Sequence, residues 1–191
     1  MSVYTEIDAR IREFIESQHM FFVGTAPSGP GGHVNISPKG IDFLRVLGPK
    51  TVVYADYTGS GIETVAHLRE NGRIAIMLCA FTGPPRIVRL HGRGEAIEPE
   101  DDSFASLLVE LRGSDSTEVP PLRSIIRVDV ERISDSCGYG VPLYQFEMQR
   151  TQLTRWASSK GPSGLREYQR IKNSRSIDGL QGLRWMGEEV S

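Results

Sequence analysis

The feature that most constrains this chain is a series of short apolar segments separated by turn residues. The apolar or β-branched segments cover residues 20–25, 33–37, 41–47 and 51–56. The segments between them contain Pro-Ser-Gly-Pro-Gly-Gly at 27–32, Pro-Lys-Gly at 38–40 and Gly-Pro-Lys at 48–50. Connections this short favour antiparallel neighbours, because a parallel crossover needs about a dozen residues or more. The N-terminal part of the chain therefore predicts antiparallel hairpins.

Further strands and a few helices complete the predicted barrel. The strands are expected at residues 73–81, 86–97 and 124–133, and the helices at 5–18, 62–70 and 100–111. In the first helix, Ile7, Ile11 and Ile15 recur at helical spacing, and Thr5 is the expected N-cap. Six or seven strands with few helices predict a mainly β fold, an antiparallel barrel with flanking helices.

The C-terminal part of the chain has a different composition. A helix is predicted from Met148 to Ser159, with a break at residues 161–164 and a new start near Leu165. We therefore divide the chain into a barrel domain, 1–147, and a helical C-terminal extension, 148–191. Residues 149–185 carry eight Lys or Arg and two acidic residues, although the whole chain has a net charge of -2. Such a cationic, amphipathic segment is expected to pack on the barrel or on a partner subunit as a lid or clasp.

Composition limits the function classes. The chain has 191 residues, of which 39% are hydrophobic, and this suits one soluble domain with an appendage. With 22 basic and 24 acidic residues it lacks the basic balance of a general nucleic-acid binder. No apolar stretch approaches the roughly 20 residues of a membrane-spanning helix, and the polar N-terminus is not signal-like. A cytoplasmic protein without a membrane partner is expected.

Metal and disulfide chemistry are not expected either. The two cysteines, Cys79 and Cys137, are too few and too far apart for a disulfide framework or a thiolate site. The four histidines are His19, His33, His67 and His91, and no two of them have metal-ligand spacing. His67 shares a helix side with Glu63 and Glu70, which predicts a solvated face.

The segment from Asp56 to Gly61 has the composition of a phosphate-binding loop. Its two glycines allow close approach of the backbone, Thr58 and Ser60 supply hydroxyls, and a helix start supplies N–H groups. An ordinary glycine-rich turn capped by Ser60 explains the same residues, and Glu63 in the first helical turn disfavours an anion. The hairpin strand that ends in Ser37-Pro38-Lys39 can lie beside this loop, where Lys39 would balance a phosphate.

The order of these segments resembles that of the pyridoxamine 5′-phosphate oxidase-like FMN-binding split-barrel superfamily. The matching segments are FVGTA at 22–26, HVNISPKG at 33–40, TVVYADYTGSG at 51–61, HLRENGRIAIMLCAF at 67–81 and RIVRLHGRGEAI at 86–97. The stretches 137–142 and 173–180 resemble a subgroup without an assigned substrate. The resemblance implies a six- to seven-stranded split barrel that forms a homodimer and holds FMN at the subunit interface.

The resemblance also implies which residues contact the cofactor. Lys39 matches the lysine that closes the second-strand motif, Ser60 matches the serine of the phosphate loop, and Arg73 matches a basic position after the loop helix. Arg86 and Arg89 fall in the strand that runs beside the flavin. The expected cofactor-binding residues are Ser37, Pro38, Lys39, Tyr57, Thr58, Gly59, Ser60, Gly61, Arg73, Arg86 and Arg89.

Departures from the resembled pattern bear on the substrate. Gly61 and Ile62 follow Ser60 where true pyridoxamine phosphate oxidases have an Arg-Lys pair, and the C-terminal Arg-x-His signature is missing. The flavin-contacting glutamine has no counterpart near residues 85–89. We therefore expect an FMN-dependent oxidoreductase that acts on a small molecule other than pyridoxamine phosphate, and no catalytic residue is identified. The alternatives are a deazaflavin in place of FMN, a non-catalytic module that holds flavin or haem, and a nucleic-acid accessory protein.

Overall fold

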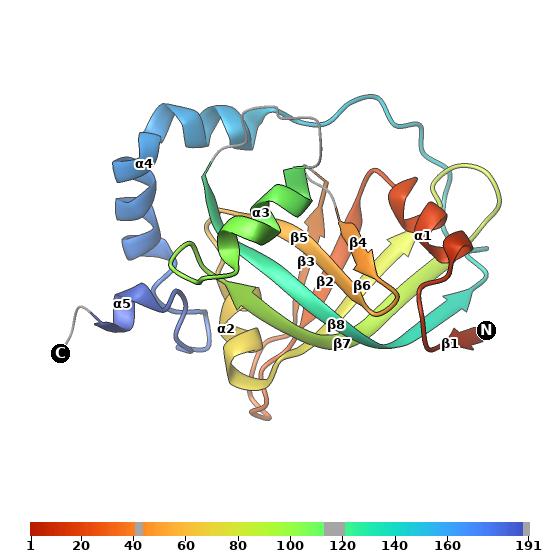
Figure 1. Cartoon of the computed structure of the whole chain (residues 1–191), viewed down its shortest axis with the longest axis horizontal. Helices are drawn as coiled ribbons and strands as arrows, with labels where there is room; N and C mark the ends of the chain where they lie inside the picture. Colours follow the sequence, from red (N-terminus) through yellow and green to blue (C-terminus); the bar gives the residue numbers. More distant parts are fainter. Residues whose placement is uncertain (41–43, 113–120, 189–191) are drawn as a thin grey trace.

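The computed structural model describes residues 1–40, 44–112 and 121–188. Within these ranges its strands are β1 (Ser2–Tyr4), β2 (Phe21–Thr25), β3 (Asn35–Lys39), β4 (Arg45–Gly48), β5 (Thr51–Tyr57), β6 (Arg73–Cys79), β7 (Ile87–Ile97) and β8 (Leu122–Ser136). The helices are α1 (Ala9–Glu16), α2 (Glu63–Asn71), α3 (Phe104–Arg112), α4 (Gln152–Lys172) and α5 (Trp185–Glu188). The mainly β fold with flanking helices is thus confirmed (Figure 1), and β1 is a strand that the sequence pattern did not predict.

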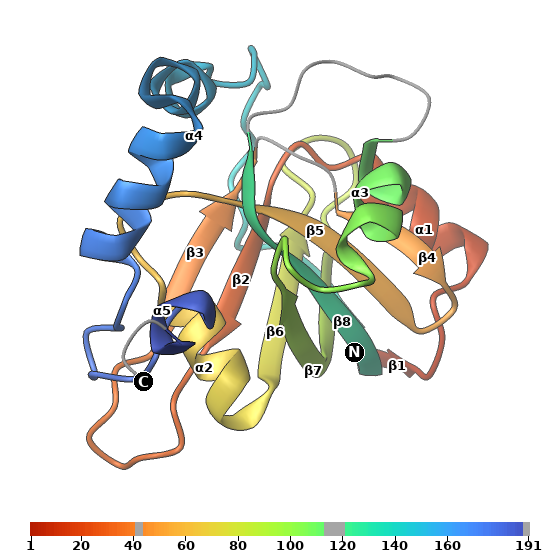
Figure 2. The ribbon, with the colours of Figure 1, turned by 60° about the vertical axis from the view of Figure 1, so that its left-hand side comes forward.

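The strands form one antiparallel sheet that curls around the main hydrophobic core, and a second, smaller apolar cluster lies between the sheet and α3. Its order is β3-β2-β6-β7-β8-β5-β4, with β1 beside β8. The inward side chains include Val23, Ile76, Leu90 and Val128, each with 0% of its surface exposed. The terminal strands β3 and β4 are not paired in this order, so the barrel is split between them. In Figure 2, β3 lies at the left of the barrel, and β5 extends toward the right.

Helix α1 closes one part of the core, and its N-cap differs from the prediction. Ile11 and Ile15 are buried, as their spacing predicts. The cap is Asp8 rather than Thr5, because the Asp8 carboxylate accepts a hydrogen bond from the Ile11 amide at 2.8 Å. The predicted Thr5 cap is therefore wrong, and the helix begins at Ala9.

Helix α2 follows the Asp56–Gly61 loop and agrees with its prediction except at one residue. Val65 and Leu68 are buried, and Gly72 ends the helix with φ 68°. His67 is fully buried, so the predicted solvated face is wrong. The reason is that α2 is covered on both sides, by Thr25 of β2 and by Asp178 of the C-terminal segment.

Several other boundaries shift. The strand predicted at 124–133 extends over Leu122–Ser136, and the helix predicted from residue 100 begins at Phe104. Of the strand predicted at 41–47, residues 41–43 lie outside the described residues. The helix predicted from Met148 begins at Gln152. The predicted break is confirmed at Gly161, where φ is 64° and two helical segments of α4 meet at a kink. Pro162 follows the kink, a position that suits proline because a new first turn needs no N–H from it.

The C-terminal extension folds back over the barrel of its own chain. The connection from β8 to α4 crosses one edge of the molecule (Figure 1). After α4 the chain returns toward α2, and Leu183 joins the barrel core with 2% of its surface exposed. The Arg184 amide then donates to both carboxylate oxygens of the buried Glu98 at 3.0 Å. No helix in the described ranges is long and apolar enough to cross a membrane.

Candidate functional site

A buried ion-pair network lies at the split of the barrel. Asp56, near the end of β5, is fully buried and accepts two hydrogen bonds from Arg123 of β8, at 2.8 and 3.1 Å. The Ser124 hydroxyl donates to the same carboxylate at 2.9 Å. The Lys39 Nζ atom, from the end of β3, lies 3.4 Å from Asp56 Oδ1. The network therefore links β3 to β5 across the side of the barrel that lacks strand pairing.

The network keeps Asp56 ionised. Burial alone would raise the pKa of this carboxyl, because it removes water from the charged form. The charges of Arg123 and Lys39, together with the hydrogen bonds from Arg123 and Ser124, outweigh burial and lower the pKa below its ordinary value. Asp56 is thus an anchor for two cations rather than a proton donor at neutral pH.

The same arginine orients the loop that follows β5. Arg123 Nη1 donates to the Gly61 carbonyl at 2.8 Å, and the Asn173 side chain donates to the Gly59 carbonyl at 2.9 Å. The chain contains no cis peptide within the described residues, and in a trans peptide the N–H points opposite to the C=O. The amides of Ser60 and Ile62 therefore point away from Arg123. The loop directs its carbonyls inward and two of its N–H groups outward.

A cavity of about 350 Å³, which we call the split cavity, lies between β3 and this loop. Six residues that the sequence singled out line it: Ser37, Pro38, Lys39, Tyr57, Gly59 and Gly61. The structure thus brings the end of the β3 hairpin and the glycine-rich loop together around one hollow.

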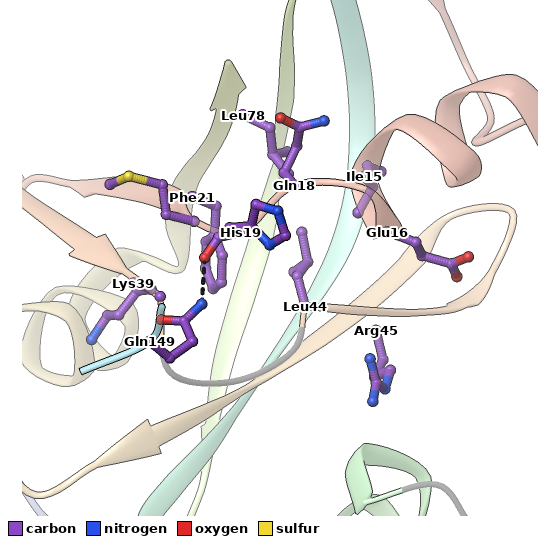
Figure 3. A pocket seen from close by; sticks show the side chains of 12 residues that line it. Ile15, Glu16, Gln18, His19, Phe21, Lys39, Leu44, Arg45, Leu78 and Gln149 are labelled. Atoms are coloured by element: carbon purple, nitrogen blue, oxygen red, sulfur yellow. Dashed lines mark hydrogen bonds between the residues drawn. The ribbon is translucent and has the colours of Figure 1, made fainter. Parts of the chain in front are cut away.

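Two further cavities meet the split cavity at Lys39 and Gly40. The larger, which we call the outer groove, has a volume of about 1030 Å³ and is lined in part by residues 144–150 of the connection from β8 to α4. Its apolar walls include Phe22, Phe81, Tyr144, Phe146 and Leu153. The smaller has about 190 Å³ and is bounded by Gln149, whose amide donates to the His19 carbonyl at 2.9 Å (Figure 3). Lys39 therefore lines all three cavities.

Comparison with known proteins identifies the family. The family model described as Pyridoxamine 5′-phosphate oxidase matches residues 7–137. A protein of Aspergillus flavus, the pyridoxamine 5′-phosphate oxidase family protein ustO, is 40% identical over 195 aligned positions, and the match covers 94% of this chain and 77% of the relative. The chain belongs to the pyridoxamine 5′-phosphate oxidase family.

Solved structures agree in fold. A variant of HupZ from Group A Streptococcus has a TM-score of 0.53 and 23% identity, and the match covers 68% of this chain and 99% of that one. A candidate pyridoxamine 5′-phosphate oxidase from Lactobacillus delbrueckii has a TM-score of 0.52 and 19% identity, with 69% and 95% covered. The split barrel is therefore the fold of this pyridoxamine 5′-phosphate oxidase family member.

The other predicted site residues of this family member lie elsewhere or serve another purpose. Thr58 is buried and accepts a hydrogen bond from Gln169 at 2.8 Å. Ser60 is exposed and does not cap α2, whose N-cap is Ile62 without a side-chain bond. Arg73 donates to the Pro27 carbonyl at 3.2 Å, at the end of the sheet away from Lys39.

Arg86, which precedes β7, and Arg89, in β7, also lie apart from the split cavity within one chain. Arg86 forms an ion pair with Asp135 at 2.7 Å and lies over the Phe14 ring at 4.6 Å. Arg89 donates to the Ser136 hydroxyl at 3.3 Å. A flavin contact of Arg73, Arg86 or Arg89 stays a prediction.

Several residues at the site were missed by sequence reasoning. Asn35, Thr64 and Arg123 line the split cavity, while Asn173 and Gln169 reach the loop from α4. Asn35 donates to the Thr64 hydroxyl at 3.1 Å and so links β3 to α2. The available signal for Arg123 was a charged residue two positions before the apolar pair Ile125 and Ile126, but the predicted strand began at residue 124, one residue too late to include it.

As for metals, no group of three or more His, Cys, Asp or Glu side chains in the described ranges is arranged to hold an ion.

Proposed function

We propose that this family member binds FMN in the split cavity and acts as an oxidoreductase on an unidentified small molecule. The observation that carries the proposal is the orientation of the loop from Thr58 to Gly61. Its carbonyls are held inward by Arg123 and Asn173, so its outward N–H groups suit an anion.

The residues present fit a phosphate monoester. Lys39 supplies a positive charge at the cavity wall. Ser60 and Ile62, the neighbours of the lining residue Gly61, would supply two amide donors from the loop. Glu63 also lines the split cavity, where its charge would oppose an anion, and it accepts a hydrogen bond from the Ile177 amide at 3.4 Å. This contact engages one oxygen of the carboxylate with the C-terminal segment.

The apolar residues of the outer groove fit a planar ring system. Aromatic side chains such as Phe22, Phe81 and Tyr144 would hold the ring and exclude water from it. A bound flavin supplies the redox chemistry, while the protein supplies anchoring and orientation. Lys39 lines both cavities, so it would lie between the phosphate and the ring of the bound flavin.

We also propose that two copies form a homodimer through the outer face of β3. Ile36 is 69% exposed, and Val34, just before β3, is 72% exposed. Exposed apolar side chains on the edge strand of a sheet mark an association site, and a two-fold dimer is the commonest arrangement. A cytoplasmic location is proposed as well, since Cys79 and Cys137 are free thiols.

The visible spectrum of the freshly purified protein tests the cofactor class. A yellow protein with a flavin spectrum, together with saturable FMN binding in a fluorescence titration, is the expected result. A colourless protein that neither quenches FMN nor takes up a deazaflavin would contradict the proposal, and a haem spectrum would support the haem module instead. Turnover with nicotinamide donors distinguishes an oxidoreductase from a flavin-binding module without activity.

A further inference from the structure

We infer that Asn173 is a positioning residue of the phosphate loop, so that the C-terminal segment forms part of the cofactor site. The inference rests on the proposed function, because it assigns to Asn173 control over the loop donors that face the flavin phosphate. Asn173 is the C-cap of α4 and lies far in sequence from the barrel motifs, 114 positions after Gly59.

Both the oxygen and the nitrogen of the Asn173 side chain form hydrogen bonds. The residue is fully buried. Its Oδ1 atom accepts a hydrogen bond from Arg123 Nη1 at 3.0 Å, and its Nδ2 atom donates to the Gly59 carbonyl at 2.9 Å. Arg123 can only donate, so it dictates which end of the amide faces it and which end faces the loop. Asn173 therefore connects the Asp56–Arg123 ion pair to the loop backbone.

The backbone of the returning segment fixes Asn173 in place. The Leu183 amide donates to the Asn173 carbonyl at 3.2 Å, and the Gly182 amide donates to the Ser174 carbonyl at 2.8 Å. A methyl group on Gly182 would lie 2.0 Å from the Asn173 carbonyl oxygen and 2.9 Å from Ile62 Cγ1. The segment thus needs a glycine here to reach both Asn173 and the N-cap of α2.

A second contact from the same helix supports this arrangement. Gln169 precedes Asn173 by one helical turn and donates to the Thr58 hydroxyl at 2.8 Å. The Asn173 amide donates to the Gln169 carbonyl at 2.7 Å, which couples the two side chains through the helix end. Consecutive turns of α4 therefore hold consecutive residues of the loop.

Loss of the Asn173 side chain would release one peptide group of the loop. The next donor to the Gly59 carbonyl, Arg123 Nη1, lies at 3.5 Å, at the limit of a hydrogen bond. Without Asn173 the Gly59–Ser60 peptide can rotate, and the Ser60 N–H then leaves its outward direction. Binding of the flavin phosphate should weaken, while binding of the flavin ring should not.

The comparison of FMN with riboflavin, which lacks the phosphate, tests this consequence. We expect Asn173→Ala to weaken FMN binding about tenfold, the loss of one hydrogen bond that orders a charged contact. Riboflavin affinity should stay within about twofold of the wild type. Asn173→Asp keeps the acceptor for Arg123 but replaces the donor to Gly59, so it should lose FMN selectivity in the same way. Ser159→Ala, an exposed change in the same helix, is the control.

The outcomes separate the inference from the proposed function. If the wild type binds no flavin, both fail. If the wild type prefers FMN and the folded Asn173 variants keep that preference, the inference fails and the proposed function stands. Equal weakening of FMN and riboflavin would show a purely structural role and would also overturn it. Far-ultraviolet circular dichroism establishes folding, and Asn173→Asp, which is nearly isosteric, serves if Asn173→Ala does not fold.

Discussion

Arg123 and Asp56 form a two-point ion pair between neighbouring strands, with N–O distances of 2.8 and 3.1 Å, and their side chains are 4% and 0% exposed. Charges this deep are tolerated only when both are neutralised and their hydrogen-bonding capacity is used. Ser124, Lys39 and two loop carbonyls use that remaining capacity. The pair is thus both a structural element of the barrel and the origin of the loop geometry.

Removal of the Asp56 charge should show how much the stability of the fold depends on the ion pair with Arg123. We expect Asp56→Asn to lower the free energy of unfolding by about 3–5 kcal/mol, because Arg123 would keep a buried charge without its counterion. Urea denaturation followed by circular dichroism measures the change. Asp129→Asn is a suitable control, since Asp129 is 62% exposed in its ion pair with Arg127 and its loss should have little effect. Equal stability of the two variants would contradict the assigned role of Asp56.

Lys39 should matter for the cofactor more than for the fold. We expect Lys39→Ala to weaken FMN binding by about 1.5–3 kcal/mol, the value of a hydrogen bond to a charged group. Fluorescence titration measures this change, and riboflavin binding should change less than FMN binding. Lys50→Ala removes an exposed turn lysine and provides the matched control. An FMN affinity unchanged by Lys39→Ala would remove Lys39 from the site.

The proposed dimer depends on the apolar face of β3. Ile36→Asp should convert the dimer to a monomer in light scattering at micromolar concentration, because a charge would be buried at the interface. Val109 on α3 is equally exposed, at 69%, so Val109→Asp provides a matched control that should leave the dimer intact. A wild type that is monomeric at this concentration, or an Ile36→Asp variant that stays dimeric, would exclude this face as the interface.

His67 should make stability depend on pH. Burial lowers the pKa of His67, and this effect outweighs the opposite influence of Asp178, Glu63 and Glu70. The folded state therefore favours neutral His67, so its stabilisation is present above the unfolded pKa of about 6.5 and is lost as the pH falls below it. His33 also lies beside Asp178, at 2.6 Å.

The measurement is the free energy of unfolding of wild type and His67→Gln between pH 7.5 and about pH 5. The wild type should lose stability more steeply than the variant toward low pH, because only the wild type has to protonate this side chain when it unfolds. The pKa of Asp178 is lowered by its hydrogen bonds with His33, so its own titration falls below this interval. Parallel curves would show that His67 does not titrate differently in the two states.

Local sequence signals predicted most of the barrel. Gly72 ends α2 as expected, and the hairpin of β2 and β3 pairs Phe21 with Lys39 and Thr25 with Asn35. The predictions went wrong where distant segments cover a local pattern. His67 has the spacing of a solvated residue but is buried by Asp178, which follows it by more than a hundred residues. Helical periodicity describes one element and carries no information about what later covers it.

In the candidate site too, local motifs could be predicted from the sequence and contacts between distant segments could not. The glycines of the loop and the lysine at the end of β3 are visible as local motifs, and the structure brings them to one cavity. The groups that orient the loop are not visible in this way, because Arg123 and Asn173 act through single hydrogen bonds from other elements. An isolated Asn at a helix end has an ordinary local role as a cap, so nothing in its neighbours indicates a contact with residue 59.

The reach of Asn173 and Gln169 back to the loop has a consequence for biosynthesis. Gln169 contacts a residue 111 positions earlier in the chain, and Asn173 contacts one 114 positions earlier. During translation the barrel strands leave the ribosome first and can begin to fold, while Gln169 and Asn173 emerge more than a hundred residues after the loop that they contact. A nascent chain therefore passes through a stage with a formed barrel and an unfixed loop, and it acquires a fully ordered loop only after the residues following α4 have been made.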